Sequence, residues 1–302
     1  MGKFTVVGTN ERKVDGRALA KGRPVFVGDI PPREGLLHLA LLHSPHAHAV
    51  IRSIDTSRAE ALEGVALVLT HLNTPTVRYT TAGQGHPEPS PYDARVFDSK
   101  VRFVGDRVAA VAADSEEVAR RACELIDVEY DTLQPVLSLD EAMADGAPVI
   151  HDEDDALDIW AAERNCVSHM VASAGDVEAG FPECDAVVDV TCETQYAQHV
   201  PIENHIATTY LDEDDRLVIV SSTQVPFHVR RIIARVIDVP VHRIRVIKPR
   251  IGGGFGVKQE VLIEDLPALV TMRTGRPAVL EYDRAQEFVS ARTRHPMLSL
   301  IH

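Results

Sequence analysis

The first half of the chain alternates short apolar runs with short helical patterns over residues 35–139. Apolar runs of strand length predict strands at residues 49–54, 65–70, 107–113 and 126–130. Apolar spacing of three and four residues predicts helices at residues 57–62 and 115–125. Asp114, with Glu117 three residues later, is expected to cap the second of these helices. The stretch between the two units, residues 74–95, is rich in Pro, Gly and polar residues and predicts a long loop.

The second half of the chain carries a similar mixture, with a hairpin near its centre. Strands are predicted at residues 186–195, 206–211, 216–222, 243–248, 278–282 and 297–301. Helical spacing predicts helices at residues 227–237 and 260–273, the latter kinked or restarted at Pro267 and ended by Gly275. Strands and helices mixed with hairpins favour an α+β fold over a doubly wound sheet.

Composition changes near residues 145–165, which suggests a boundary between two domains. The turn signal Asp145-Gly146-Ala147-Pro148 precedes an acidic run at residues 151–155. Because the glycine and the distal glutamate of a calcium-binding EF-hand loop are missing, we interpret the acidic run as a solvated linker. We therefore expect one domain over residues 1–148 and a second over residues 149–302.

The overall composition is that of an ordinary globular protein, with 45% hydrophobic and 25% charged residues among 302. A net charge of −14 argues against a nucleic-acid partner, because phosphate binding requires clustered Lys and Arg. No apolar run is long enough to span a membrane and the first residues lack a secretory signal, so we expect a cytoplasmic protein. The four cysteines show no Cys-x-x-Cys spacing, so we expect no iron–sulfur cluster or zinc site and interpret them as buried small residues: Cys123, Cys166, Cys184 and Cys192.

One glycine-rich segment between a predicted strand and a predicted helix carries the most information about chemistry: Gly252, Gly253, Gly254, Phe255 and Gly256. Successive glycines let the backbone approach a ligand, and outward-facing amides near a helix start suit anionic groups or the oxygen ligands of a metal centre. A phosphate-binding P-loop would need Ser or Thr where Gln259 stands. A dinucleotide fingerprint beginning at Gly252 would need glycine where Val257 stands. Taken alone, the segment is either a ligand-binding loop of another kind or a turn from strand to helix.

The segment resembles part of the molybdenum-binding domain of the xanthine dehydrogenase and aldehyde oxidase family. The match includes, in the same order and spacing, residues 218–224 (VIVSSTQ), 239–246 (VPVHRIRV) and 251–258 (IGGGFGVK). Nearer the start, residues 13–16, 42–49 and 104–111 resemble the family's a/b hammerhead domain. The resemblance covers nearly the whole chain and implies an a/b hammerhead domain followed by a partial, mixed α/β molybdenum-cofactor domain.

The resemblance also implies roles for single residues. Gln224 matches the glutamine whose side-chain amide faces an oxygen ligand of molybdenum, where a neutral donor can stabilise developing negative charge. The glycine-rich segment matches the loop beside the metal and its pterin, where backbone amides hold the cofactor. Gln259 stands where some purine hydroxylases of the family carry a substrate-contacting Glu, and Glu203 is a candidate for lining the substrate channel or for a structural hydrogen bond. Taken alone, Gln224 equally fits a helix cap, and Lys258 a solvated cation near an acidic neighbour such as Glu260.

A compact His-x-x-His-x-His pattern is formed by His43, His46 and His48. A metal site would need imidazoles that converge on one point and are oriented by further partners. Because the segment resembles a hammerhead turn, we interpret these histidines as structural.

By resemblance, the protein is the molybdenum-cofactor-binding portion of a hydroxylase that oxidises an aldehyde or a xanthine-like N-heterocycle with water as the oxygen source. The implied cofactor is molybdenum–molybdopterin, with or without a cytosine dinucleotide, and 2Fe-2S clusters and FAD are expected in an iron–sulfur subunit and an FAD subunit. The family's general base lies in a later part of the molybdenum subunit that we do not find here, so we expect this chain to be inactive alone. The alternative is a truncated or non-catalytic scaffold that keeps the fold without binding cofactor.

Overall fold

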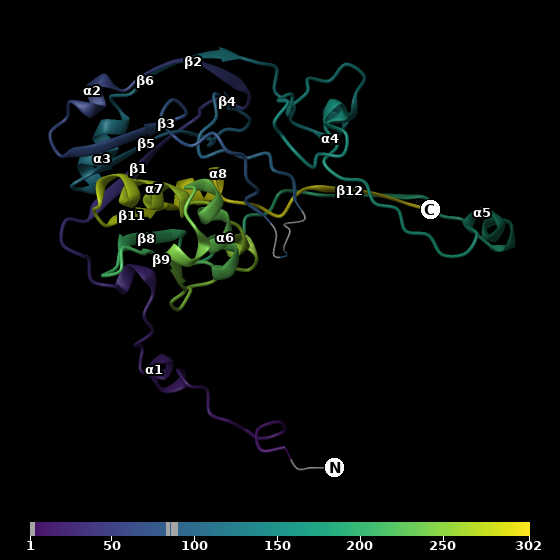
Figure 1. Cartoon of the computed structure of the whole chain (residues 1–302). Coiled ribbons are helices and arrows are strands. Elements are labelled where there is room, and N and C mark those ends of the chain that lie inside the picture. The colour runs from purple at the N-terminus through teal and green to yellow at the C-terminus, as the bar shows by residue number, and fades with distance from the viewer. Residues whose placement is uncertain (1–3, 83–84, 86–89) are drawn as a thin grey trace.

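A seven-stranded mixed sheet forms the centre of the computed structural model, which describes residues 4–82, 85 and 90–302 (Figure 1). The strand order is β10-β9-β8-β11-β1-β5-β3. The strands are β1 (Leu37–His43), β3 (Val65–Thr70), β5 (Arg107–Ala113), β8 (Ile206–Leu211), β9 (Leu217–Ser221), β10 (Ile244–Ile247) and β11 (Ala278–Glu281). β1 pairs with β11 in parallel, so strands from both halves of the chain share one sheet. This mixture of parallel pairs, hairpins and helices confirms the α+β class.

Helices cover both faces of the sheet. α6 (Pro226–Val236) and α7 (Asp265–Thr274) contribute to the largest core, while α2 (Ser57–Glu60) and α3 (Glu116–Cys123) contribute to a second core. β5 serves both cores, because its alternate side chains point to opposite faces. This explains why its sequence is a continuous run of small apolar residues and not an alternating one.

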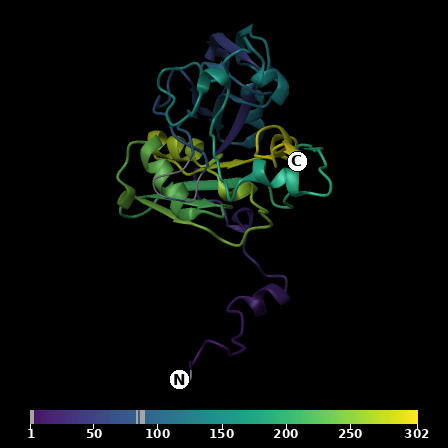
Figure 2. The same cartoon turned by 90° about the vertical axis from the view of Figure 1, so that its right-hand side faces the viewer.

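A small three-stranded sheet is made of β2 (Ala49–Asp55), β4 (Lys100–Val101) and β6 (Asp127–Thr132). In Figure 1 it lies above the strands that the first half contributes to the central sheet. Seen after a turn of 90°, most first-half elements lie above the helices and strands of the second half (Figure 2). Residues 4–26, which precede η1 (Val27–Asp29) and include α1 (Gly16–Ala20), extend away from the body. The other short elements are α4 (Leu139–Met143), η2 (Ala162–Arg164), η4 (Val241–Arg243), η5 (Val257–Gln259) and α8 (Arg284–Val289).

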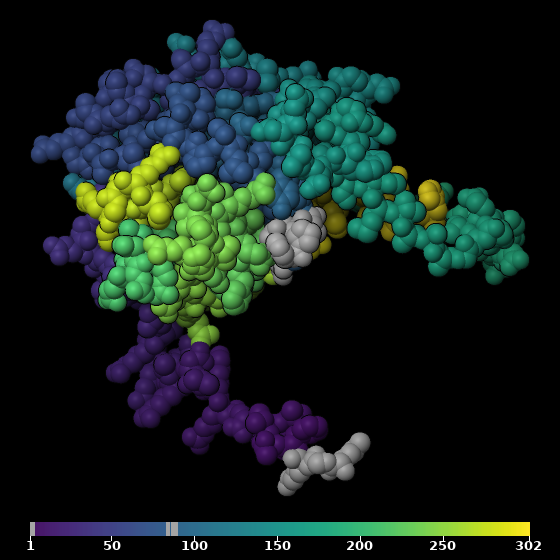
Figure 3. All heavy atoms as spheres, in the orientation of Figure 1, coloured from purple at the N-terminus to yellow at the C-terminus, as the bar shows by residue number. Residues whose placement is uncertain are grey.

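A two-stranded antiparallel ribbon projects from the body and is formed by β7 (Val190–Thr194) and β12 (Met297–Ile301) (Figure 3). α5 (Val177–Gly180) and η3 (Phe181–Glu183) lie at the far end of this projection. Every residue of β7 is exposed, so neither face of the ribbon packs against the core. No helix in the parts of the chain that the structure describes has the length and apolarity to cross a membrane.

Two predicted helix starts are wrong. The cap of α3 is Ser115, whose hydroxyl accepts from the Val118 N–H, while Asp114 forms an ion pair with Arg276 at 2.7 Å. α7 begins at Asp265 and not at residue 260, which puts Pro267 in the first turn, where a missing N–H breaks no helical hydrogen bond. Gly275, with a φ of 68°, ends α7 as predicted.

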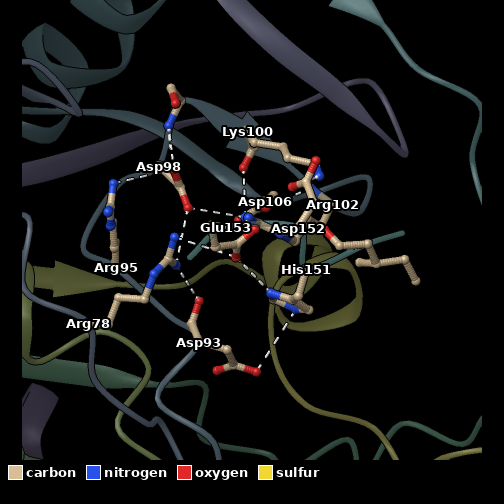
Figure 4. A network of polar contacts seen from close by, with 12 residues as sticks. Arg78, Asp93, Arg95, Asp98, Lys100, Arg102, Asp106, His151, Asp152 and Glu153 are labelled. Atoms are coloured by element: carbon tan, nitrogen blue, oxygen red, sulfur yellow. Dashed lines mark hydrogen bonds and ion pairs between the residues drawn. The ribbon is translucent and has the colours of Figure 1, made fainter. Parts of the chain in front are cut away.

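The acidic run at 151–155 is partly solvated as predicted, with Asp152, Asp154 and Asp155 exposed, but it is not a free linker, because it docks against basic side chains of the first half (Figure 4). Glu153 accepts from Arg102 at 2.8 Å, and Asp152 pairs with Lys100 at 2.7 Å. Asp155 pairs with Arg78, whose side chain is only 5% exposed. Arg78 lies within the predicted loop of residues 74–95, and Arg102 follows it. Their acidic partners lie some 50 to 80 residues later, so no local sequence pattern could have indicated these ion pairs.

The cysteine interpretation holds for Cys123 alone. Its thiol is buried, and burial raises its pKa to about 12. Cys184 and Cys192 are exposed and Cys166 is partly exposed, so calling them buried residues was wrong. Cys184 lies in the projecting segment after η3 and Cys192 lies in β7, where there is no core to receive them.

Candidate functional site

The glycine-rich segment forms an irregular loop between β10 and η5. Gly253 and Gly256 have φ angles of 102° and 105°, which L side chains rarely adopt. Phe255 also has a positive φ, 51°, and its side chain is 75% exposed. The ring therefore points out of the protein, while Gly254 before it is buried.

Gln224 lies directly beside this loop, where the strand β9 gives way to the helix α6. The Gly256 N–H donates to Gln224 Oε1 at 3.2 Å, and the Gln224 N–H donates to the Lys258 carbonyl at 2.8 Å. A Cβ on Gly254 would lie 2.5 Å from Gln224 Oε1, so only glycine permits this approach. The structure thus brings Gln224 and the loop together, and the roles assigned to them stay a prediction.

The chemistry of these contacts fixes which way the Gln224 amide faces. Because a backbone N–H can only donate, the oxygen of the amide must face Gly256, and the Nε2 group faces away from it. Within the described ranges, Gln224 Nε2 has no hydrogen-bond partner, and neither do the N–H groups of Gly253, Gly254 and Phe255. The site therefore presents four donors without acceptors.

Glu203 and Lys258 lie beneath the loop and form a buried ion pair. Lys258 Nζ donates to Glu203 Oε2 at 2.9 Å and to the Glu203 carbonyl at 2.8 Å. Glu203 Oε2 also accepts from the Gly252 N–H at 2.8 Å. Lys258 is 0% exposed, so its description as a solvated cation is wrong; the acidic neighbour named for it, Glu260, pairs with Arg292 instead.

Burial shifts the charged groups around this pair. Desolvation lowers the pKa of Lys258, and the Glu203 carboxylate acts in the opposite direction. Burial opposes ionisation of Glu287, but hydrogen bonds from His205 and the charge of Lys258 hold its pKa below the usual value. Charges thus lie under the loop, while its outer side carries neutral donors.

The segment from His199 to Pro201 lies along the loop, and sequence reasoning gave these residues no role. Pro201 Cβ lies 3.4 Å from where a Gly253 Cβ would stand, and His199 Nε2 lies 3.7 Å from the corresponding position of Gly256. Between them, Val200 has a φ of 47°, an unusual conformation for a β-branched residue. This strained turn carries no sequence signature, since neither glycine nor asparagine marks it.

The remaining candidate, Gln259, lies at the end of the loop. Its N–H donates to the Gly256 carbonyl at 3.1 Å, and its half-buried side chain has no hydrogen-bond partner in the described part of the chain. Glu203 uses one carboxylate oxygen to hold the loop, and its other oxygen, Oε1, is buried without a partner. Both side chains thus retain hydrogen-bonding capacity.

The three clustered histidines contact different neighbours. His48 Nδ1 lies 2.8 Å from the Gln134 carbonyl, the His46 ring meets Tyr130 edge-on, and the His43 ring meets Tyr282. Burial, followed by the charge of Arg107, lowers the pKa of His43 to about 4. These separate contacts agree with a structural interpretation.

Comparison with known proteins shows which family the chain is similar to. Residues 158–302 match the molybdopterin cofactor-binding domain, and residues 21–134 match the aldehyde oxidase and xanthine dehydrogenase a/b hammerhead domain. Gln224 and the glycine loop thus lie in the domain that matches the molybdopterin cofactor-binding domain. The chain belongs to the xanthine dehydrogenase and aldehyde oxidase family of molybdenum hydroxylases.

Individual relatives agree with this assignment. The chain is 44% identical to a probable hypoxanthine oxidase of Escherichia coli (strain K12), with 96% of this chain and 33% of the relative covered. The aldehyde oxidoreductase of Desulfovibrio desulfuricans has a TM-score of 0.80 and 29% identity, covering 95% of this chain and 32% of that one. Quinoline 2-oxidoreductase of Pseudomonas putida 86 has a TM-score of 0.78 and 28% identity, covering 97% and 36%. The chain spans about a third of the length of these relatives.

The residues of the site fit a molybdopterin cofactor. Such a cofactor carries oxygen and phosphate groups that accept hydrogen bonds, and the loop offers three adjacent N–H donors and the Gln224 amide without acceptors. Gln224 packs closely against Gly254, and the Phe255 ring and Pro201 lie close to Gly253. Neutral donors suit such a site, because they impose no competing ion.

Proposed function

We propose that this chain is the cofactor-binding portion of a molybdenum hydroxylase that oxidises an aldehyde or an N-heterocycle, with water as the oxygen source. The observation that carries the proposal is the unpaired Gln224 Nε2 donor beside three unpaired backbone donors of the glycine loop. When bound, the molybdenum cofactor supplies the two-electron oxidation of the substrate carbon. The residues of this chain bind and orient it.

Gln224 donates its Nε2 hydrogen bond to an oxygen of the cofactor. Its Oε1 is held by the Gly256 N–H, so the amide does not need to turn when a ligand arrives. The N–H groups of Gly253, Gly254 and Phe255 hold further acceptor atoms, and Gly252 fixes the start of the loop through Glu203.

An N-heterocycle is the better supported of the two substrate classes. Two of the similar proteins are named for hypoxanthine and quinoline, which are both N-heterocycles. Gln259 has an amide without a partner, and an amide can both donate to a ring nitrogen and accept from a ring N–H. Glu203 is the second candidate contact, and because its partnerless Oε1 is buried, such a contact would require the side chain to move.

The proposal assigns the other steps to partner chains. The four cysteines lack the spacing of a cluster site, so we expect 2Fe-2S clusters and FAD in an iron–sulfur subunit and an FAD subunit. The general base and the remaining pterin contacts are expected from the rest of the molybdenum subunit, so this chain alone is expected to be inactive. We expect a cytoplasmic assembly, whose pterin carries a cytosine dinucleotide or none. We favour this function over a scaffold without cofactor because Gln224 and the glycine loop are both intact and adjacent.

Metal and pterin analysis of the native assembly tests the proposal. The parent assembly is expected to contain molybdenum and pterin in proportion to this chain, and a Gln224→Ala variant is expected to fold but to lose turnover. Gln195→Ala, at an exposed position outside the loop, is the matched control and should behave as the parent. An assembly that is complete but free of molybdenum and pterin would refute the cofactor assignment.

A further inference from the structure

Glu203 and Lys258 connect the two ends of the glycine loop. At the first end, Glu203 and Gly252 exchange two hydrogen bonds: Gly252 N–H to Glu203 Oε2 at 2.8 Å, and Glu203 N–H to the Gly252 carbonyl at 3.1 Å. At the other end, Lys258 Nζ donates to the same carboxylate oxygen and to the Glu203 carbonyl. A single carboxylate oxygen thus ties together the residues that precede and follow the loop.

The packing at Gly252 depends on the same contact. A Cβ on Gly252 would lie 2.5 Å from Glu203 Cβ and 3.4 Å from the Glu203 nitrogen. Glycine is therefore required there because Glu203 lies so close, and not because Gly252 must approach a ligand. The start of the loop is fitted to the side chain that holds it.

Stability alone does not account for such a pair. Lys258 is 0% exposed and the Glu203 side chain 14% exposed, so both charges have lost most of their water. The desolvation of a buried pair commonly cancels its attraction, and apolar replacements of similar size are often neutral or stabilising. A buried pair retained beside a binding loop is better explained by the geometry that it imposes.

We propose that Glu203 and Lys258 are positioning residues that hold the glycine loop in its cofactor-binding shape before the cofactor arrives. The inference rests on the proposed function for the identity of the ligand, but the clamp itself is a property of the chain without cofactor.

Hydrogen exchange of the full chain without cofactor tests the clamp. In Lys258→Met, which keeps the length of the side chain but removes its charge and donors, exchange in peptides covering residues 250–260 is expected to accelerate about 10- to 100-fold. Exchange in β5 should change no more than in the control. Lys100→Met is that control, because Lys100 also has a poorly exposed side chain in an ion pair, with Asp152, but lies away from the loop. Parent-like exchange at residues 250–260 in a folded Lys258→Met variant would overturn the proposal.

A second pair of variants separates positioning from mere neutralisation of charge. Glu203→Gln retains an acceptor for the Gly252 N–H, and combining it with Lys258→Met leaves no unpaired charge. If the pair only balances charge, the double variant regains the slow exchange of the parent, and the proposal fails. If the pair positions the loop, exchange stays fast, because the link from position 258 to the Glu203 carbonyl is still missing.

The same variants can be told apart from a failure of the proposed function. Pterin content in the assembled parent tests the function, whereas exchange of the cofactor-free chain tests the clamp. If both ideas hold, Lys258→Met lowers the pterin retained per assembled chain, while Lys100→Met does not. If the parent assembly lacks pterin, the proposed function is refuted. If the Lys258→Met chain still shows faster loop exchange than the parent chain, the clamp proposal stands.

Discussion

Replacing Gly254 by alanine should displace the Gln224 side chain while leaving the stability of the protein nearly unchanged. The new Cβ would lie 2.5 Å from Gln224 Oε1, 2.7 Å from its Cδ and 3.1 Å from its Cγ. Gly254 does not have a positive φ, so alanine fits the local backbone. Because the clash falls on the end of a flexible side chain, we expect Gln224 to turn away while the loop keeps its path.

The energetic cost of this substitution should be small. Turning Gln224 away breaks the Gly256 N–H···Oε1 hydrogen bond, worth about 1 kcal/mol. The alanine also restricts the unfolded chain, which returns about 0.4–1 kcal/mol. The net change in unfolding free energy is therefore expected to stay within about 1 kcal/mol. Loss of one well-placed donor to a developing negative charge lowers turnover by about 10²–10³-fold in other enzymes, and we expect a similar loss here.

Two other glycines supply the comparison. In Gly252→Ala the clash falls on Glu203 Cβ, close to the backbone, so the chain itself must move and a loss of about 1–3 kcal/mol is expected. Gly28→Ala is the neutral control, because its nearest contact is an ordinary 3.9 Å from Ile206 Cδ1. Urea denaturation of the full chain gives the free energies, and turnover is measured in the assembled enzyme. Parent-like turnover in Gly254→Ala, or a stability loss equal to that of Gly252→Ala, would refute the reasoning.

Three further predictions concern buried charge away from the loop. Asp265→Ala leaves Arg107 buried without its 2.8 Å partner and should cost about 3–5 kcal/mol in urea denaturation, whereas an apolar double variant should recover most of this loss. Since the pKa of His43 is lowered to about 4, its stabilising contribution of about 3 kcal/mol is complete above pH 6.5 and is lost as the pH falls through 4. A His43→Phe variant should flatten that part of the pH–stability curve; an unchanged curve would contradict the assignment. Burial opposes the ionisation of Glu153, but His151 and Arg102 hold its pKa well below the usual value, so Glu153→Gln should destabilise the chain at pH 7 and lose this difference in acid.

The strands were largely predictable because their pattern is local. The continuous apolar run of β5 and the hairpin of β8 and β9 follow from periodicity, and both lie where the sequence placed them. The cap of α3 was missed by one residue, because Asp114 and Ser115 are both good caps and the choice depends on a distant Arg276. α8 escaped prediction because its six residues are too few to show helical periodicity.

The candidate site, too, has features that the sequence shows and features that only the fold shows. The glycine loop is visible in the sequence, and Gln224 follows from the resemblance to a family, not from local pattern. The burial and ion pairing of Lys258 were not predictable, because its partner Glu203 lies 55 residues earlier in the sequence. A lysine next to glutamine and glutamate is solvated in most contexts, and only the fold shows that Glu203 comes beneath it.

The glycines of the loop are therefore not, by themselves, the evidence for a ligand. Gly252 and Gly254 are required by side chains of the same protein, Glu203 and Gln224, and the other two glycines by the turns of the backbone. A loop of this shape could be explained with no ligand at all. What the glycines do not determine is the group of donors without a protein acceptor among the described residues, Gln224 Nε2 and three adjacent N–H groups, which are available to a ligand. If Gly254→Ala and Lys258→Met both disturb cofactor retention while the folded chain remains stable, the donors and the residues that place them, not the glycine content, define the site.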